Sequence, residues 1–225
     1  MTDISWTVDV AGDTISAAVD IPTTAERRVV FVCSHGAGGN MNDRAVRATA
    51  KALCERGMTV VRHNFVYTEK KSGRPDPMPK LQDCIAAVVE RARRELRPDL
   101  VLIGGRSMGG RAASMLASTG FDADGLLLLA YPLHPAGQPA KLRDAHLPSI
   151  TMPTICFNGT RDALCTPELM NAVLQRVGDN WTMHWVEGAD HSFHVLKSSG
   201  RTDAQVMAEI ADAASGWAAR LRQRS

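Results

Sequence analysis

A short apolar run in this chain ends in a serine-bearing turn and passes at once into a helical segment. Residues 100–110 read Leu-Val-Leu-Ile-Gly-Gly-Arg-Ser-Met-Gly-Gly. The pattern predicts a strand, a tight turn with Ser107 at its apex, and a helix. Such a turn exposes the hydroxyl in a crowded backbone conformation, and Gly105 and Gly109 leave room for neighbouring backbone. We therefore predict a nucleophilic serine at position 107.

Two other interpretations of the same turn stay open. A glycine-rich strand-to-helix turn can serve packing alone, or it can hold a phosphate at the helix N-terminus. No Gly-Lys-Ser or Gly-Lys-Thr follows in the sequence, which argues against a nucleotide-binding P-loop.

Apolar strand-like segments alternate with helical segments along most of the chain. Strands that are apolar throughout indicate a mostly parallel sheet covered on both faces. We expect a three-layer α/β/α sandwich with an N-terminal antiparallel hairpin, one domain over residues 1–225 and no large cap domain. The expected strands are Trp6–Val10, Thr14–Ile21, Arg28–Ser34, Met58–Phe65, Leu100–Gly104, Leu126–Tyr131, Thr154–Phe157 and Trp181–Val186. The expected helices are Ala45–Arg56, Leu81–Leu96, Ser107–Ser118, Pro167–Val177 and Ala204–Arg222. Between them, Tyr67–Pro79 is expected to be an irregular loop, and Pro132–Met152 a connection with one short helix.

The composition narrows the class of protein. The 225 residues carry 26 Lys and Arg against 24 Asp and Glu, a net charge of +2, so no global attraction to nucleic acid or to a membrane is implied. The first residues lack the pattern of a signal peptide. Five cysteines without C-x-x-C spacing argue against a disulfide scaffold and a structural zinc site. Cys33, Cys84 and Cys156 lie in apolar surroundings and are expected in the core. We expect a cytoplasmic protein.

A nucleophilic serine needs a histidine that takes its proton and a carboxylate that orients this histidine. Of seven histidines, His191 follows the last expected strand through a short loop and is the favoured base. His184 lies inside that strand, and His194 is the alternative base. The pair His191-x-x-His194 could suggest a metal site, but no third ligand has a useful spacing, so we expect no metal.

The carboxylate should also follow a strand. Asp162 comes directly after Thr154–Phe157 and is the leading candidate, although such loops also use aspartate to cap turns. Negative charge that develops on a substrate oxygen needs preset donors. The backbone N–H of Met108 is one expected donor, and the N–H of Ala37, or alternatively of Gly38, is the other.

Four segments together resemble the α/β-hydrolase fold, over about residues 28–222. They are Ser34-His35-Gly36-Ala37-Gly38-Gly39, Gly105-Arg106-Ser107-Met108-Gly109, Gly159-Thr160-Arg161-Asp162 and Gly188-Ala189-Asp190-His191-Ser192-Phe193. More narrowly, the chain resembles the small cap-less branch that includes Tex30/KANSL3-like proteins and relatives of dienelactone hydrolases. The segments Asn64-Phe65-Val66-Tyr67 and Lys71-Ser72-Gly73-Arg74-Pro75-Asp76-Pro77 carry this narrower resemblance.

The resemblance implies a triad of Ser107, Asp162 and His191, with an oxyanion hole from the first loop and Met108. Dienelactone hydrolases proper use a cysteine nucleophile, so their substrate is not carried over. The implied activity is a serine hydrolase acting on small acyl esters, without a cofactor. A non-catalytic interaction protein and an acyltransferase or thioesterase are the alternatives, and a monomer or a homodimer is equally compatible with the sequence.

The residues around the expected site suggest which substrate groups it could bind. Candidate substrate-binding residues are His35, Gly36, Phe65, Arg74 and Arg106. Basic residues expected near the mouth could favour an ester that carries an acid or a phosphate. Alternatively, these side chains could be solvated on the surface or engaged in structural ion pairs. They are Arg62, Lys70, Lys71, Arg74, Arg106, Arg111 and Arg161.

Overall fold

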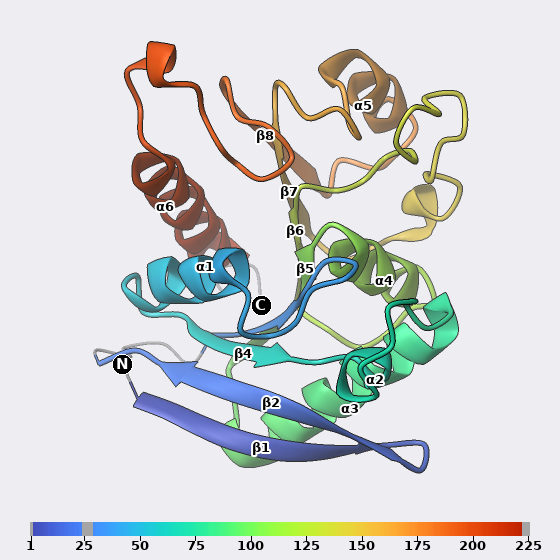
Figure 1. The fold of residues 1–225 in the computed structure, drawn as a ribbon, viewed down its shortest axis with the longest axis vertical. Coiled ribbons are helices and arrows are strands. Elements are labelled where there is room, and N and C mark those ends of the chain that lie inside the picture. Colours follow the sequence, from blue (N-terminus) through green and yellow to red (C-terminus); the bar gives the residue numbers. More distant parts are fainter. Residues whose placement is uncertain (1, 24–28, 222–225) are drawn as a thin grey trace.

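The computed structural model describes residues 2–23 and 29–221. In these residues eight strands form one sheet in the order β1-β2-β4-β3-β5-β6-β7-β8 (Figure 1). The strands are β1 (Thr2–Val10), β2 (Asp13–Ile21), β3 (Val29–Ser34), β4 (Thr59–His63), β5 (Leu100–Arg106), β6 (Gly125–Leu129), β7 (Thr154–Gly159) and β8 (Trp181–Val186). The hairpin of β1 and β2 is antiparallel and joins β4 antiparallel, whereas β4, β3 and β5 to β8 are parallel neighbours.

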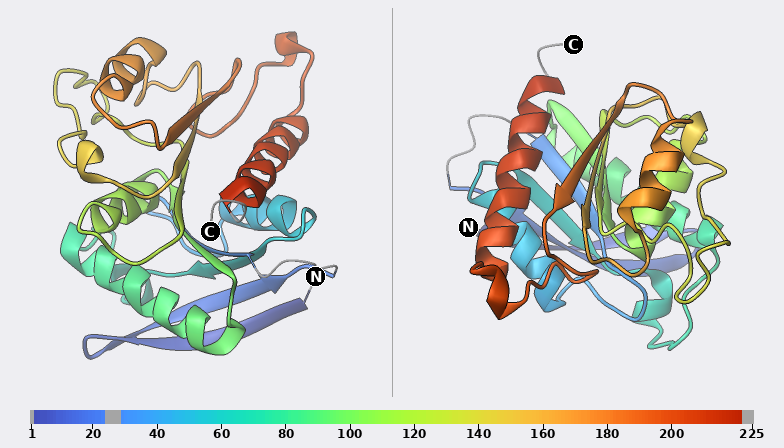
Figure 2. Two further views of the ribbon diagram at one scale, coloured as in Figure 1. Left: turned by 180° about the vertical axis from the view of Figure 1, so that it is seen from behind. Right: turned by 90° about the horizontal axis from the view of Figure 1, so that it is seen from above.

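Helices cover both faces of this sheet, as the two views in Figure 2 show. The α-helices are α1 (Arg44–Cys54), α2 (Val66–Glu69), α3 (Met78–Leu96), α4 (Met108–Ala117), α5 (Pro167–Leu174) and α6 (Asp203–Leu221). Helices α1 and α6 pack into one apolar cluster, and α3, α4 and α5 into the other. The predicted three-layer sandwich with an N-terminal antiparallel hairpin is confirmed.

The central strands are apolar throughout because each face meets helices. In β3, Val30 and Val32 join the cluster under α3 and α4, while Phe31 and Cys33 join the cluster under α1 and α6. All six residues of this strand are buried. The five cysteines are all buried and free, so the expected core position of Cys33, Cys84 and Cys156 is confirmed. No helix in the described ranges is both long enough and apolar enough to cross a membrane.

The segment between β4 and α3 differs from its prediction as an irregular loop. It contains the single-turn helix α2, and α3 begins three residues before the expected start, at Met78. Pro79 therefore lies in the first turn of α3, where a proline removes no helical hydrogen bond. The connection after β6 holds one short 3-10 helix, Leu147–Ser149, as expected. Arg28 and Arg222, the expected ends of a strand and a helix, lie outside the described residues.

A buried ion pair joins β2 to β4. Arg62 Nε lies 2.5 Å from Asp20 Oδ2, and the two side chains are only 4% and 3% exposed. Arg62 Nη1 also donates to the Met41 carbonyl at 2.7 Å. Arg62 therefore belongs to the core of the sheet and not to the mouth of the site, which corrects its expected position.

Replacing Arg62 with methionine should lower the free energy of unfolding by about 3–5 kcal/mol, because the Asp20 carboxylate stays buried without its partner. Urea unfolding followed by circular dichroism measures the loss. Lys51→Met is the matched control, because Lys51 and Glu55 form an exposed ion pair whose loss should leave the free energy of unfolding almost unchanged. Equal losses in the two variants would contradict the structural role of the buried pair.

Candidate active site

Ser107 occupies a strained turn between β5 and α4. Its φ of 49° and ψ of −116° lie outside the regions that residues other than glycine ordinarily adopt. The Ser107 N–H donates to the Leu129 carbonyl at 2.9 Å, and the Ser107 carbonyl accepts from the Arg111 N–H at 2.9 Å. Bonds to β6 on one side and to α4 on the other thus hold the strained residue in place.

Two glycines bring the loop after β3 against this turn. A Cβ atom on Gly105 would lie 2.2 Å from the Ser34 carbonyl oxygen, and one on Gly109 would lie 2.6 Å from the His35 carbonyl oxygen. Both distances are below any real Cβ contact, so only glycine fits. Gly36 in the approaching loop would place a Cβ 3.6 Å from the Ser107 Cβ. The expected close approach of backbone to the serine turn is therefore present.

The loops after β7 and β8 bring Asp162 and His191 to Ser107. His191 Nε2 lies 3.0 Å from Ser107 Oγ, and His191 Nδ1 lies 2.8 Å from Asp162 Oδ2. An ionised carboxylate only accepts hydrogen bonds, so Nδ1 of His191 donates to it. In the neutral ring Nε2 then accepts the Ser107 hydroxyl proton. The arrangement can move a proton from the serine to the histidine.

Hydrogen bonds from residues other than His191 also hold the Asp162 carboxylate in place. Its side chain is fully buried, while that of His191 is 26% exposed. Asn158 Nδ2 donates to Asp162 Oδ2 at 3.0 Å, and the Leu164 N–H donates to Oδ1 at 2.8 Å. Asn158 also bonds to both the N–H and the carbonyl of Tyr131. No role was predicted for Asn158, although it directly follows the expected strand Thr154–Phe157.

The other candidate histidines have different partners. His194 Nδ1 lies 3.0 Å from both carboxylate oxygens of Asp203, and His184 Nε2 lies 2.8 Å from Glu209 Oε1. Ser107 contacts His191. In the part of the chain that the structure describes, no cluster of three His, Cys, Asp or Glu side chains could hold a metal ion.

The loop from His35 to Gly39 has a fixed peptide orientation. The Gly36 carbonyl accepts from the Gly39 N–H at 3.1 Å and from His35 Nδ1 at 2.8 Å. Because a trans peptide points its N–H opposite to its carbonyl, the Ala37 N–H points away from these bonds. Burial lowers the pKa of His35, so the ring is neutral near pH 7 and its Nε2 accepts from the Phe65 N–H at 3.4 Å.

A cavity of about 210 Å³ opens at Ser107. Its lining consists of Gly36, Ala37, Gly39, Asp43, Ala45, Val46, Arg106, Ser107 and His191. Gly38 is not in this lining. Met108 is the first residue of α4, where backbone N–H groups have no partner within the helix. The cavity thus gathers the serine, the histidine and the glycine-rich loop at the carboxyl ends of the parallel strands.

Residues 27–219 match the family model described as an alpha/beta hydrolase domain. The chain belongs to this family. Its fold resembles a serine hydrolase homologue from Coxiella burnetii, at 22% identity and a TM-score of 0.77 over 94% of this chain and 97% of that one. It also resembles a lidless serine hydrolase from Xanthomonas campestris, at 24% identity and a TM-score of 0.77 over 96% and 95%. A dienelactone hydrolase from Anabaena variabilis matches at 18% identity and a TM-score of 0.73 over 96% of each chain.

Three of the expected substrate-binding residues of this hydrolase-family chain lie away from the cavity. The side chains of His35, the first residue of the glycine-rich loop, and of Phe65 are completely buried against each other, with ring centroids 4.8 Å apart, so they present no surface to a ligand. Arg74 is exposed between α2 and α3 and does not line the cavity at Ser107. Gly36 and Arg106 do line it.

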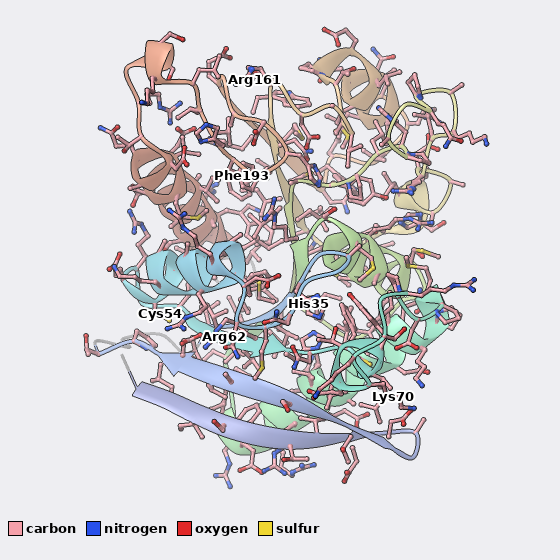
Figure 3. All side chains as sticks on the ribbon, viewed as in Figure 1. His35, Cys54, Arg62, Lys70, Arg161 and Phe193 are labelled. Atoms are coloured by element: carbon pink, nitrogen blue, oxygen red, sulfur yellow. The ribbon has the colours of Figure 1, made fainter. Side chains whose placement is uncertain are left out.

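The basic residues of the α/β hydrolase domain do not form one cluster. Lys70 pairs with Asp13 of the β1–β2 hairpin at 2.6 Å, and Arg161 donates to the Gly188 carbonyl at the opposite end of the sheet (Figure 3). Arg106 lines the cavity at Ser107, and its Nη2 donates to the His191 carbonyl at 2.8 Å. Burial lowers the pKa of the Arg106 guanidinium. Arg106 is the one Lys or Arg in the lining described for the cavity at Ser107.

Proposed function

We propose that the protein is a serine hydrolase that cleaves acyl esters through an acyl-enzyme on Ser107. The observation that carries the proposal is the hydrogen-bonded series Ser107–His191–Asp162, with the serine on its strained turn at the wall of a cavity. A serine hydroxyl is a weak nucleophile, and a histidine oriented by a buried carboxylate activates it. The proposed reaction uses no cofactor.

In the proposed reaction His191 Nε2 takes the Ser107 proton while Oγ attacks the ester carbonyl carbon. The tetrahedral intermediate collapses, the carbon–oxygen bond to the alcohol breaks, and His191 gives its proton to the leaving oxygen. A water molecule then attacks the acyl-enzyme, with His191 again as the base, and releases the acid and free Ser107. Asp162 stabilises the imidazolium in both halves and remains ionised.

Two backbone donors would stabilise the oxyanion of the intermediate. The Met108 N–H lies at the start of α4, directly after the nucleophile. The Ala37 N–H is the second, because Ala37 lines the cavity and the bonds to the Gly36 carbonyl orient the peptide between them. Donors that are fixed before the charge develops contribute strongly to catalysis.

The site favours esters that can reach an open cavity. The connection after β6 is short and carries one 3-10 turn, and no large cap covers the carboxyl ends of the described strands. Est1E from Butyrivibrio proteoclasticus, in a structure with bound ferulic acid, shares the fold at 18% identity and a TM-score of 0.71 over 91% of this chain and 96% of that one. Acyl transfer and thioester hydrolysis would use the same three side chains, so they are alternatives within the same mechanism.

A fluorophosphonate probe should label the wild-type protein covalently and leave Ser107→Ala unlabelled, because the probe reacts with an activated serine hydroxyl. In-gel fluorescence and intact mass spectrometry measure the adduct. Ser118→Ala is the control: it removes a hydroxyl at the C-terminal end of α4, which bonds to Met115. We expect it to label like the wild type. Absence of labelling in folded wild-type protein would contradict the proposed function, and it would favour a non-catalytic interaction protein.

A further inference from the structure

A second and larger cavity lies beside the one at Ser107. It has a volume of about 430 Å³ and opens between the N-terminal halves of α1 and α6 and the loop after His191. Its lining consists of Arg44, Ala45, Ala48, Thr49, Arg106, Leu129, Ser192, Phe193, His194, Asp203, Ala204 and Met207. Phe193 belongs to the apolar cluster under α1 and α6, and Figure 3 shows it on the α6 side of the strands. The cavity is therefore on the face opposite to α3, α4 and α5.

This α1–α6 cavity adjoins the cavity at Ser107. Ala45 and Arg106 line both cavities. Arg106 Nη2 donates to the His191 carbonyl and lies 3.4 Å from Ser192 Oγ, so its guanidinium is held at the boundary between the two spaces. A substrate arm that passes Arg106 from a carbonyl at Ser107 would enter the larger cavity.

The chemistry of the walls selects the kind of arm. Ala45, Ala48, Leu129, Phe193 and Met207 provide apolar surface. Several polar groups in the walls already have partners inside the protein. The Thr49 hydroxyl donates to the Ala45 carbonyl at 3.0 Å, and Asp203 accepts from His194 and from the Val195 N–H. An alkyl chain gains from leaving water for such walls, and the volume is within the range of ligand pockets.

We propose that the α1–α6 cavity binds one apolar arm of the ester, so that the preferred substrates carry an alkyl chain of medium length on one side. The proposal rests on the proposed function and narrows its substrate class. No pattern in the sequence predicts this cavity, because Ala48 and Met207 lie on helices that are far apart in the chain and come together only in the folded protein.

Ala48→Trp tests the proposal, because Ala48 lines the cavity and is exposed on α1, so an indole there can take up space in the cavity without disturbing the core. The measurement is the ratio of kcat/KM for a long ester to that for a short one. One series compares p-nitrophenyl octanoate with p-nitrophenyl acetate, and the other compares octyl acetate with ethyl acetate. In the series whose variable arm enters the cavity, we expect the ratio to fall by about tenfold or more.

The matched control is Arg47→Trp, which adds the same indole at the exposed neighbouring position outside the cavity lining. We expect it to keep both ratios at the wild-type value. The series that responds shows whether the acyl or the alcohol arm is bound. Unchanged ratios in both series for Ala48→Trp, or an equal fall in the control, would overturn the proposal.

A binding measurement separates failure of the cavity from failure of the catalytic proposal. In Ser107→Ala protein labelled with ¹³C at the methionine methyl groups, 1-octanol should shift the Met207 resonance, because Met207 lines the cavity. Ala48→Trp in the same background should abolish the shift. Absence of a Met207 shift would overturn the cavity proposal even if esters are hydrolysed. A shift in Ser107→Ala, together with a wild-type protein that hydrolyses no ester, would sustain the cavity proposal and contradict the catalytic function.

Discussion

Replacing His191 with glutamine lowers kcat for ester hydrolysis by at least about a thousandfold, on the proposed mechanism. Glutamine retains hydrogen-bonding groups of similar reach but cannot accept the Ser107 proton and return it to the leaving alcohol. The fold should not change, because the His191 side chain is partly exposed and does not contribute to the apolar clusters. Initial rates with p-nitrophenyl acetate measure the loss, and circular dichroism checks the fold.

His184→Gln is the matched control for this experiment. His184 lies in β8, pairs with Glu209 and is not in the lining of either cavity at the site. We expect its kcat to stay within about twofold of the wild-type value, since changes away from the reacting groups affect stability more than chemistry. If His191→Gln retained the rate of the control, His191 would not be the base and the proposed mechanism would be wrong.

Replacing Gly105 with alanine should lower the free energy of unfolding by about 3 kcal/mol. The new methyl group would lie 2.2 Å from the carbonyl oxygen of Ser34 and 2.5 Å from its nitrogen, so β3 and β5 would have to separate. The φ of +136° adds a backbone cost, because side chains rarely adopt this conformation. Urea unfolding measures the change.

Gly120→Ala separates the two contributions. Gly120 has a φ of +81°, but nothing lies within 4 Å of an added Cβ. Its alanine variant should therefore show only the backbone cost, about 1 kcal/mol. A loss for Gly105→Ala no larger than for Gly120→Ala would mean that the sheet absorbs the methyl group and that close approach does not explain the glycine.

The residues that follow strands were the most predictable part of the site. Ser107, Asp162 and His191 each come after an apolar run that is visible in the sequence, and parallel strands place these positions at one edge. The structure joins the three side chains by hydrogen bonds through His191. The buried faces of helices were predictable from the spacing of their apolar residues. In α6 these residues recur with helical spacing and are all buried: Val206, Ile210, Ala214 and Trp217.

Features that depend on contacts between distant segments could not be predicted. The His35 and Phe65 side chains are buried against each other, with ring centroids 4.8 Å apart, and nothing in their sequence neighbourhoods indicates this contact. The ion pair of Arg62 with Asp20 depends on the register between β4 and β2. Helix α2 has only four residues, too few for a periodic pattern. Because the register between β4 and β2 cannot be read from the sequence, Arg62 was expected at the mouth of the site and not in an ion pair inside the sheet.

The distance along the chain between Ser107 and His191 also matters for the synthesis of the protein. The two residues are 84 positions apart, and the base is attached to the edge strand β8. The ribosome synthesises Ser107 before His191, and the contacts of the serine turn with β6 and with the loop after β3 use no residue beyond Leu129. Under the proposed mechanism the hydroxyl of Ser107 would be an ordinary weak nucleophile until β8 pairs with β7 and the loop after β8 brings His191 to it.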